Sequence, residues 1–359
     1  MNTSLALLSG KGGSGKTTIS LSIATVLHTS GIKVLLVDCD MGTHSLMYFF
    51  REYLDSNIKQ LSFADCTKTD ITCEPLKPIK IKDNLHFIPS IIDEQQETQY
   101  YAVDASIFNS NIEWLKKNYE AIIFDCQSGN TPLFEHLLPK INGTLFVVEP
   151  DSVSGRSIHT LVSHTASFMV NSEKKHYVFN KVREEHDRDK MRNDYVIEDI
   201  PLKHLKHIMF SWRFMDFYDM SELPEFKNLD AHFSTSIFRL CDVFFPAEEY
   251  QDKISVSKKK LLLSKREKLD GNLRSSRKSS LNKIISRIAI STLIAIVALF
   301  ITLFLIDFER LTESAIIMSI AVVASIVMFG IITAGIYAHK LAHKDDIEKE
   351  LDAIDQYLL

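Results

Sequence analysis

The residues best suited to chemistry lie together near the N-terminus, where residues 10–18 read Gly-Lys-Gly-Gly-Ser-Gly-Lys-Thr-Thr. This order satisfies the pattern G-x-x-x-x-G-K-[ST], a loop whose backbone N–H groups wrap the phosphates of a nucleotide. In that pattern Lys16 reaches the outer phosphates and Thr17 is placed to bind Mg²⁺. The predicted nucleotide-binding residues of the loop are Gly10, Lys11, Gly12, Gly13, Ser14, Gly15, Lys16, Thr17 and Thr18.

Carboxylates follow two other apolar runs of the chain. Asp38 and Asp40 come after the run at residues 33–37, and Asp125 comes after the run at residues 121–124. Open α/β sheets place their ligands at the carboxyl ends of parallel strands. We therefore expect all three carboxylates near the phosphate loop, with Asp125 on the Mg²⁺ side of the site.

These groups need a sheet to position them. The phosphate loop requires a buried strand before it and a helix after it, and residues 5–8 and 17–28 have the matching apolar patterns. Further apolar runs predict strands at residues 33–37, 85–88, 121–124, 144–148 and 176–179. Strands that alternate with helical segments predict an α/β fold with a doubly wound, mostly parallel sheet, here over residues 1–250.

The C-terminal third has a different composition. Residues 288–306 and 314–338 contain no charged side chain, and each run is long enough for a helix to cross a bilayer. A buried helical hairpin in a soluble core is the alternative. Lysines and arginines flank both outer ends, whereas the connector at residues 307–313 has three acids and one arginine, which predicts both termini on the cytoplasmic side.

The net charge of −5 is unevenly distributed. Residues 253–287 carry twelve lysines and arginines and two acids, so the N-terminal domain itself is acidic. An acidic domain argues against nonspecific DNA binding. We interpret residues 251–287 as a basic juxtamembrane linker or stalk that contacts anionic lipid, with a solvated linker as the alternative. Residues 339–359 are expected to form a cytosolic helical tail, either packed on that stalk or independently solvated.

Two further features leave alternatives open. The stretch at residues 209–217 is rich in aromatic residues and is either core, a lid or a partner surface. The cysteines form no C-x-x-C pair and are expected to be free thiols, and no spacing of histidines indicates a metal site. The cysteines are Cys39, Cys66, Cys73, Cys126 and Cys241.

The combined motifs resemble the ParA/MinD family of P-loop ATPases over about residues 1–245. The resemblance is carried by Lys11 within the loop, the Asp38-Cys-Asp40 run, Asp125, residues 147–152 and Asn180-Lys181. A lysine at the second loop position is what distinguishes the deviant Walker A group. The resemblance implies ATP and Mg²⁺ as ligands and a face-to-face homodimer in which Lys11 touches the nucleotide of the partner.

The same resemblance assigns the remaining roles. Lys11, Lys16 and Asp40 would be catalytic, with Asp40 positioning the attacking water and Asp38 beside it. Thr17, Asp40 and Asp125 would lie around Mg²⁺. Gly129 would sense the γ-phosphate, and Asn180 with Lys181 would contact the nucleotide.

The chain also departs from the family pattern. After Asp125 it reads Cys-Gln-Ser-Gly129, where the family has proline, so we expect the switch there to have a different shape. Because two full spans would hold the chain permanently, ATP would control dimer closure and the capture of an unidentified protein partner rather than membrane attachment. We therefore predict an ATPase switch in the inner (cytoplasmic) membrane.

The alternatives include a bacterial tyrosine kinase and an ATPase that targets or inserts membrane clients. The kinase would need a tyrosine cluster, and the tail has only Tyr357. A client-inserting ATPase would use residues 209–217 as its groove. An iron–sulfur carrier would need a cysteine pair, and a nucleotide-binding protein without hydrolysis is disfavoured by the retained lysines and carboxylates.

Overall fold

The computed structural model of the chain describes residues 3–54, 60–72, 77–92 and 103–183, much of 202–272, and part of the tail. The gaps within 202–272 are residues 206, 210, 212–213, 215–221, 227, 247 and 249, and the described tail residues are 347–349, 351–352 and 354–355. The chain divides into two compact units, Met1–Leu262 and Leu263–Leu359.

The first unit is built on an eight-stranded sheet with the strand order β3-β4-β2-β5-β1-β6-β7-β8. All neighbouring strands are parallel except β3, which pairs antiparallel with β4. All six predicted strands are present, and the predicted doubly wound, mostly parallel sheet is confirmed. The strands are β1 (Thr3–Leu8), β2 (Val34–Cys39), β3 (Ile79–Lys82), β4 (Leu85–Ile88), β5 (Ala121–Cys126), β6 (Gly143–Val148), β7 (Lys174–Phe179) and β8 (Lys203–His204).

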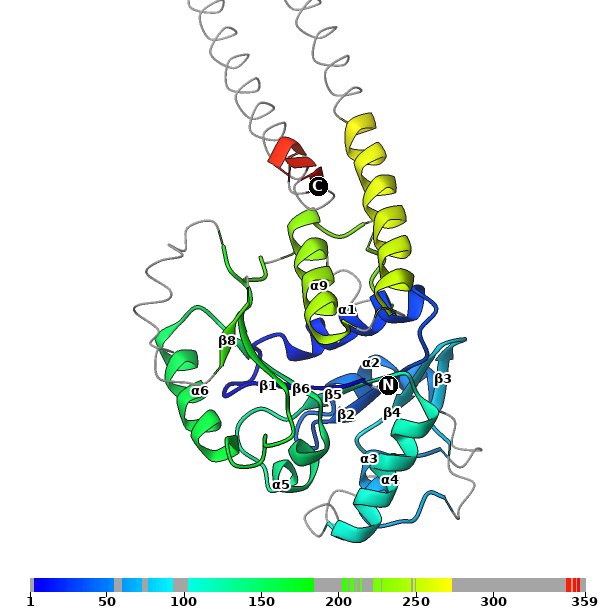
Figure 1. Cartoon of the computed structure of the whole chain (residues 1–359), viewed down its shortest axis with the longest axis vertical. Helices are drawn as coiled ribbons and strands as arrows, with labels where there is room; N and C mark the ends of the chain where they lie inside the picture. The colour runs from blue at the N-terminus through cyan, green and yellow to red at the C-terminus, as the bar shows by residue number, and fades with distance from the viewer. Residues whose placement is uncertain are drawn as a thin grey trace, which may run out of the picture. The chain divides into compact units, whose positions relative to one another are not determined.

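Helices cover both faces of this sheet (Figure 1). One face carries α1 (Lys16–Thr29) and α9 (Ala231–Phe244), and the other carries α3, α4, α5 and α6. The remaining helices are α2 (Ser45–Phe49), η1 (Arg51–Tyr53), α3 (Phe63–Cys66), α4 (Ala105–Asn118), α5 (Leu133–Leu137), η3 (Leu138–Lys140) and α6 (Ser152–Thr165). Residues 250–272 are also helical.

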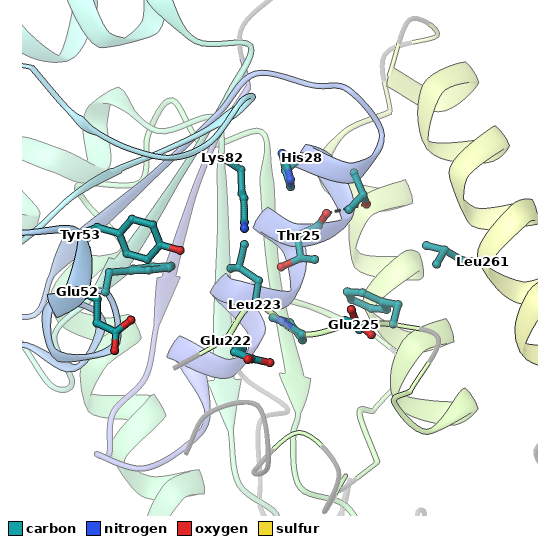
Figure 2. Close-up of a pocket in the computed structure, with 13 residues that line it drawn as sticks. Thr25, His28, Glu52, Tyr53, Lys82, Glu222, Leu223, Glu225 and Leu261 are labelled. Atoms are coloured by element: carbon teal, nitrogen blue, oxygen red, sulfur yellow. Dashed lines mark hydrogen bonds between the residues drawn. The ribbon is translucent and has the colours of Figure 1, made fainter. Parts of the chain in front are cut away.

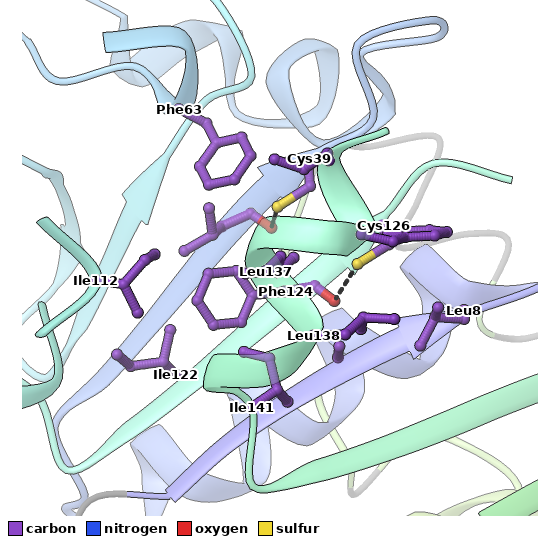
Figure 3. Packing of buried hydrophobic residues seen from close by; sticks show 14 of the residues in the cluster. Leu8, Cys39, Phe63, Ile112, Ile122, Phe124, Cys126, Leu137, Leu138 and Ile141 are labelled. Carbon is purple, nitrogen blue, oxygen red and sulfur yellow. Dashed lines mark hydrogen bonds between the residues drawn. The ribbon is translucent and has the colours of Figure 1, made fainter. Parts of the chain in front are cut away.

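A large hydrophobic cluster lies under α3, α4, α5 and α6. Alternate residues of the central strands point into it, including Phe124, whose ring Figure 3 shows among Ile112 of α4 and Leu137 of α5. Side chains on successive strand positions point to opposite faces, so the fully buried central strands have a near-continuous apolar sequence. That pattern is why these strands could be recognised in the sequence.

The opposite face packs against α1 and α9. Phe244 of α9 lies so close to β6 that a methyl group on Gly143 would be 2.8 Å from its ring. The ring also packs edge-on against His176 of β7, with 5.4 Å between the centroids. The helix α9, which carries Phe233, Phe238 and Phe244, therefore covers the sheet from the side of α1.

Several predictions for the aromatic stretch and the cysteines can be compared with the described residues. Phe214 is buried and its ring is 5.7 Å from that of Phe233, and Met209 packs against the large cluster. Phe214 thus belongs to the core and Met209 is partly buried against it, whereas Phe210, Trp212 and Phe217 lie outside the described residues. The four described cysteines are buried and free, and Cys73 lies outside the described residues.

The predicted spans at residues 288–306 and 314–338 lie outside the described residues. Within the described ranges, no helix has the length and apolar character to cross a membrane. In the second unit, Arg266 pairs with Asp355 of the tail at 3.3 Å between Nε and Oδ1, and Ile354 is fully buried. Asp355 of the tail thus contacts Arg266, which lies in the helical segment 250–272.

Candidate nucleotide-binding site

The phosphate loop joins β1 to α1, as the sequence predicts. Gly13 and Gly15 have positive φ angles of 78° and 93°, a backbone region that glycine enters at little cost. Gly15 precedes the first turn of α1 and provides no side-chain cap, so the N–H groups there remain open to a ligand. A methyl group on Gly12 or Gly13 would meet nothing within 4 Å, so the space beside these two residues is open and can admit a ligand.

Lys16 shows what the loop is suited to bind. Its side chain is only 6 % exposed, and its Nζ donates to the hydroxyls of Ser9 at 2.7 Å and Ser128 at 2.6 Å. Burial lowers the pKa of Lys16, and the charges of Asp125 and Asp40 oppose that shift. Both hydrogen-bond partners are neutral, so the buried ammonium favours an anion beside it.

Ser14 adds a second observation. Its hydroxyl oxygen is buried and has no hydrogen-bond partner within the described structure. Buried polar atoms are nearly always paired, so an unpaired hydroxyl inside the loop is suited to a ligand oxygen. The open N–H groups, the buried lysine and this hydroxyl together fit a nucleotide phosphate.

The two buried carboxylates lie side by side across β2 and β5, because Asp38 is in register with Asp125. Asp125 accepts hydrogen bonds from Thr17 Oγ1 at 2.7 Å and from Ser20 Oγ at 3.2 Å. Burial raises the pKa of Asp125 to about 6, although Lys16 and the Thr17 hydroxyl oppose the shift. Thr17 and Asp125 therefore stand together where the sequence predicts the Mg²⁺ side of the site.

Asp38 is placed behind that pair. It accepts hydrogen bonds from the backbone N–H groups of Asp40 at 2.9 Å and Met47 at 3.1 Å. Burial raises the pKa of Asp38 well above its usual range, and the neighbouring Asp125 adds to the shift. Asp38 thus shapes the loop after β2 from inside the protein.

Asp40 is held by its own loop. Its Oδ1 accepts from the N–H groups of Gly42 at 3.0 Å and Thr43 at 2.9 Å, and its Oδ2 accepts from Thr43 Oγ1 at 2.7 Å. His44, which follows Thr43 in this loop, has a positive φ of 50°. Asp40 is therefore held in its own loop by three hydrogen bonds, two on Oδ1 and one on Oδ2.

A cluster of opposite charges lies on the other side of the loop. Lys11 Nζ is 3.2 Å from Glu149 Oε2 and 3.4 Å from Asp151 Oδ2, and these contacts raise the pKa of Lys11. Lys181 Nζ donates to the backbone carbonyl of Gly13 and lies 2.6 Å from Glu149 Oε1. Lys11 is thus held by acids of its own chain, at the edge of the loop.

Asn180 and Gly129 complete the predicted set. Asn180 Nδ2 donates to the carbonyl of Ser14 at 2.8 Å, so its amide supports the loop from below. Gly129 has a φ of 80°, and its N–H donates to the carbonyl of Ser9 at 2.8 Å. All the predicted site residues are thus in or beside one loop.

The structure also adds residues that the sequence reasoning did not assign. Ser9 and Ser128 hold Lys16, whereas Glu149 and Asp151 hold Lys11. Glu149 and Asp151 follow β6 at its carboxyl end, and this position was the signal that could have identified them.

A separate pocket of about 640 Å³ lies at the opposite end of α1 (Figure 2). It is lined by Thr25 and His28 of α1, Lys82 of β3, and residues 52–53 and 222–226, among others. None of the predicted site residues lines it. The pocket therefore adds nothing to the nucleotide-binding site.

Sequence comparisons point to one family. Residues 2–179 match a family model described as an AAA domain. The septum site-determining protein MinD of Synechocystis is 27% identical over 162 residues, which cover 45% of this chain and 59% of that protein. MinD of Bacillus subtilis is 23% identical over 164 residues, with the same coverage of 45% and 59%. The chain thus spans somewhat under two thirds of these relatives.

Solved structures agree on the fold. MinD of Pyrococcus horikoshii, complexed with Mg-ADP, superposes with a TM-score of 0.55 at 19% identity, covering 70% of this chain and 99% of that one. A ParA family ATPase from Chlorobium tepidum gives 0.51 at 18% identity, covering 71% and 97%. The phosphate loop with Lys11 and the MinD relatives make the N-terminal domain of this chain similar in sequence to the ParA/MinD family of P-loop ATPases, and the solved structures show that it shares their fold.

Proposed function

We propose that this protein is a membrane-anchored ATPase whose ATP-dependent dimerisation acts as a switch that positions or recruits a partner protein. The relatives named as septum site-determining proteins support a positioning role. The Mg-ADP complex of the Pyrococcus horikoshii relative supports ATP and Mg²⁺ as the ligands.

The observation that carries the proposal is the position of Lys11. Of the two lysines of the loop, Lys16 is buried, whereas the side chain of Lys11 is 42% exposed and is held by Glu149 and Asp151. A second lysine with no role inside its own loop is available to reach the nucleotide of a second copy. Its acidic partners must then be exchanged for phosphate, which couples dimer closure to bound ATP.

The other residues of the site would have separate roles in ATP hydrolysis. Lys16 and the N–H groups before α1 would bind the phosphates. Thr17 and Asp125 would hold Mg²⁺, which neutralises charge on the phosphates when it is bound. Asp40, once released from Thr43, would orient the attacking water. Phosphoryl transfer needs this positioning and charge neutralisation more than covalent help.

The membrane part of the proposal rests on residues 288–306 and 314–338 and on the basic residues that flank them. Both termini would be cytoplasmic, on the inner membrane, with lipid contacts from the basic segment 251–287. A chain anchored in this way stays on the membrane through the ATP cycle. ATP would therefore change the dimer and its partner, not the attachment.

The test is the solution mass of full-length Asp40→Ala protein in detergent, with ATP and Mg²⁺ and separately with ADP. Asp40→Ala should bind ATP and hydrolyse it far more slowly than wild type, so the mass should double with ATP and not with ADP. Lys11→Ala should remain monomeric in both. A mass that does not respond to nucleotide would refute the switch and leave an assembly held by the membrane segments.

A further inference from the structure

The run Cys-Gln-Ser between Asp125 and Gly129 replaces the proline of the family pattern, and the function proposed above gives Gln127 no role. The strand register shows where this residue lies. β2 and β5 are parallel, with Asp38 beside Asp125 and Cys39 beside Cys126. Asp40 and Gln127 are the next residues after these two strands, so they leave the sheet next to each other.

The loop after β2 also approaches the side chain of Gln127. A methyl group on Gly42 would lie 3.1 Å from Gln127 Nε2, 3.5 Å from Asp40 Oδ1 and 3.7 Å from Gln127 Cδ. The amide of Gln127 and the carboxylate of Asp40 therefore face the same small space above Gly42. The next residue, Ser128, contacts Lys16 at 2.6 Å, so this space borders the predicted phosphate site.

The amide of Gln127 has no assigned bonding role in the part of the chain that the structure describes. No hydrogen bond of its side chain is found there, although it is half-buried. By contrast, Asp40 uses both oxygens on its own loop. A partly buried amide whose N–H donors and carbonyl oxygen are all free is suited to hold a polar ligand.

The chemistry of the proposed reaction needs such a group. The oxygen of a water molecule bonds to the γ-phosphorus, the bond from that phosphorus to the bridging oxygen breaks, and its electron pair stays on ADP. The protons of the water leave with inorganic phosphate and solvent. In other phosphate-loop NTPases a glutamine amide orients this water. An ionised carboxylate can only accept hydrogen bonds, whereas an amide can both accept and donate them.

We infer that Gln127 is a positioning residue that, together with Asp40, holds the attacking water in this enzyme. The inference rests on the proposed ATPase function and extends it. Gln127 Nε2 would donate to the released Asp40 carboxylate, and Oε1 would accept an O–H of the water. The Gln127 amide would thus replace the Thr43 hydroxyl as the hydrogen-bond donor to the Asp40 carboxylate.

The experiment compares full-length wild type with Gln127→Ala, Gln127→Glu and Asn130→Ala in detergent. Asn130 is the matched control, because its amide lies in the same loop but contacts His164 at 3.2 Å. Three quantities are measured: steady-state ATP hydrolysis, the ATP dissociation constant by fluorescent-nucleotide titration, and the capture of ADP with aluminium fluoride or beryllium fluoride. Aluminium fluoride mimics the transition state and depends on a positioned water, whereas beryllium fluoride mimics bound ATP.

Gln127→Ala should lower kcat about 100-fold, the size expected for losing one placed polar group, with KM and ATP affinity nearly unchanged. Capture of ADP–aluminium fluoride should weaken by a similar factor and capture of ADP–beryllium fluoride should not. Gln127→Glu, which keeps the size but loses the donor, should resemble Gln127→Ala. Asn130→Ala should behave as wild type.

A double variant separates this role from simple packing. If both residues act on one water, Asp40→Ala combined with Gln127→Ala should be no slower than Asp40→Ala alone. Independent multiplication of the two losses would overturn the inference. So would unchanged aluminium fluoride capture, or an equal loss of both fluoride complexes, which would mean that Gln127 only packs on Gly42. Wild type that neither hydrolyses ATP nor captures either complex would overturn the proposed function itself.

Discussion

Asp125 should make the stability of the nucleotide-free protein depend on pH in an unusual direction. Burial raises its pKa from 3.8 to about 6 in the folded protein, whereas the unfolded chain leaves the carboxyl near its ordinary value. Between these two values the folded state binds more protons than the unfolded state. Stability contributed by the protonated group is therefore present at low pH and is lost as the pH rises to about 6.

The magnitude follows from the difference of roughly two pKa units. Each unit is worth about 1.4 kcal/mol, so ionised Asp125 costs about 3 kcal/mol of unfolding free energy at pH 7. Asp125→Asn keeps an oxygen that can accept from Thr17 and removes the charge. We expect this variant to be about 3 kcal/mol more stable than wild type at pH 7 without nucleotide or Mg²⁺, and about equal to it near pH 4.

The assay is urea unfolding of the full-length chain at several values of pH in the presence of a chelator, followed by the fluorescence of Trp114, which packs against the hydrophobic cluster under α3, α4, α5 and α6. Asp83→Asn is the matched control, because Asp83 is exposed and Lys80 lowers its pKa, so its pH dependence has the opposite sign. The same change of stability between pH 4 and 7 in wild type and Asp125→Asn would refute the reasoning. That result would mean that Asp125 is paired well enough to ionise at its ordinary pKa.

Two substitutions in the loop test its packing. Gly15→Ala should lower the unfolding free energy by about 2 kcal/mol and weaken ATP binding, because the new methyl would lie 2.2 Å from Asn180 Nδ2 at a positive φ. Thermal unfolding and nucleotide titration measure the two effects. The control is Gly12→Ala, whose methyl meets nothing within 4 Å and which should unfold like wild type. Ser128→Ala removes an acceptor from buried Lys16 and should cost about 1–3 kcal/mol without nucleotide. ATP should restore that loss as a shift in melting temperature, because phosphate replaces the hydroxyl, and an equal loss with and without ATP would contradict the assignment.

The sheet was predictable because each central strand can be recognised from its own short run of residues. Strands such as β2 and β5 are buried on both faces and therefore apolar throughout, and their carboxyl ends are marked by acids. β3 was missed because its residues alternate with exposed lysines, and β8 because it has only two residues. Short edge strands depend on the neighbour they pair with, and that neighbour is not visible in their own sequence.

The site was predictable in its members but not in its contacts. The loop pattern identified Lys16 and Thr17 because backbone geometry and phosphate charge restrict the residue types there. The partners Glu149, Asp151 and Ser128 come from other strands, and only the fold shows that they meet Lys11 or Lys16. For the same reason Asn180, expected to contact the nucleotide, is found bonded to the loop itself.

The structure also explains how a single set of residues could act as a switch. Each charged group that the proposed reaction needs is bound to its own chain: Lys16 to hydroxyls, Lys11 to Glu149, and Asp40 to Thr43. Each of these contacts competes with a contact to nucleotide, a second copy or water. ATP can shift the protein between the two arrangements only by the difference in affinity between them. In the proposed switch, the strength of these internal contacts would set how much of the ATP binding energy remains to close the dimer.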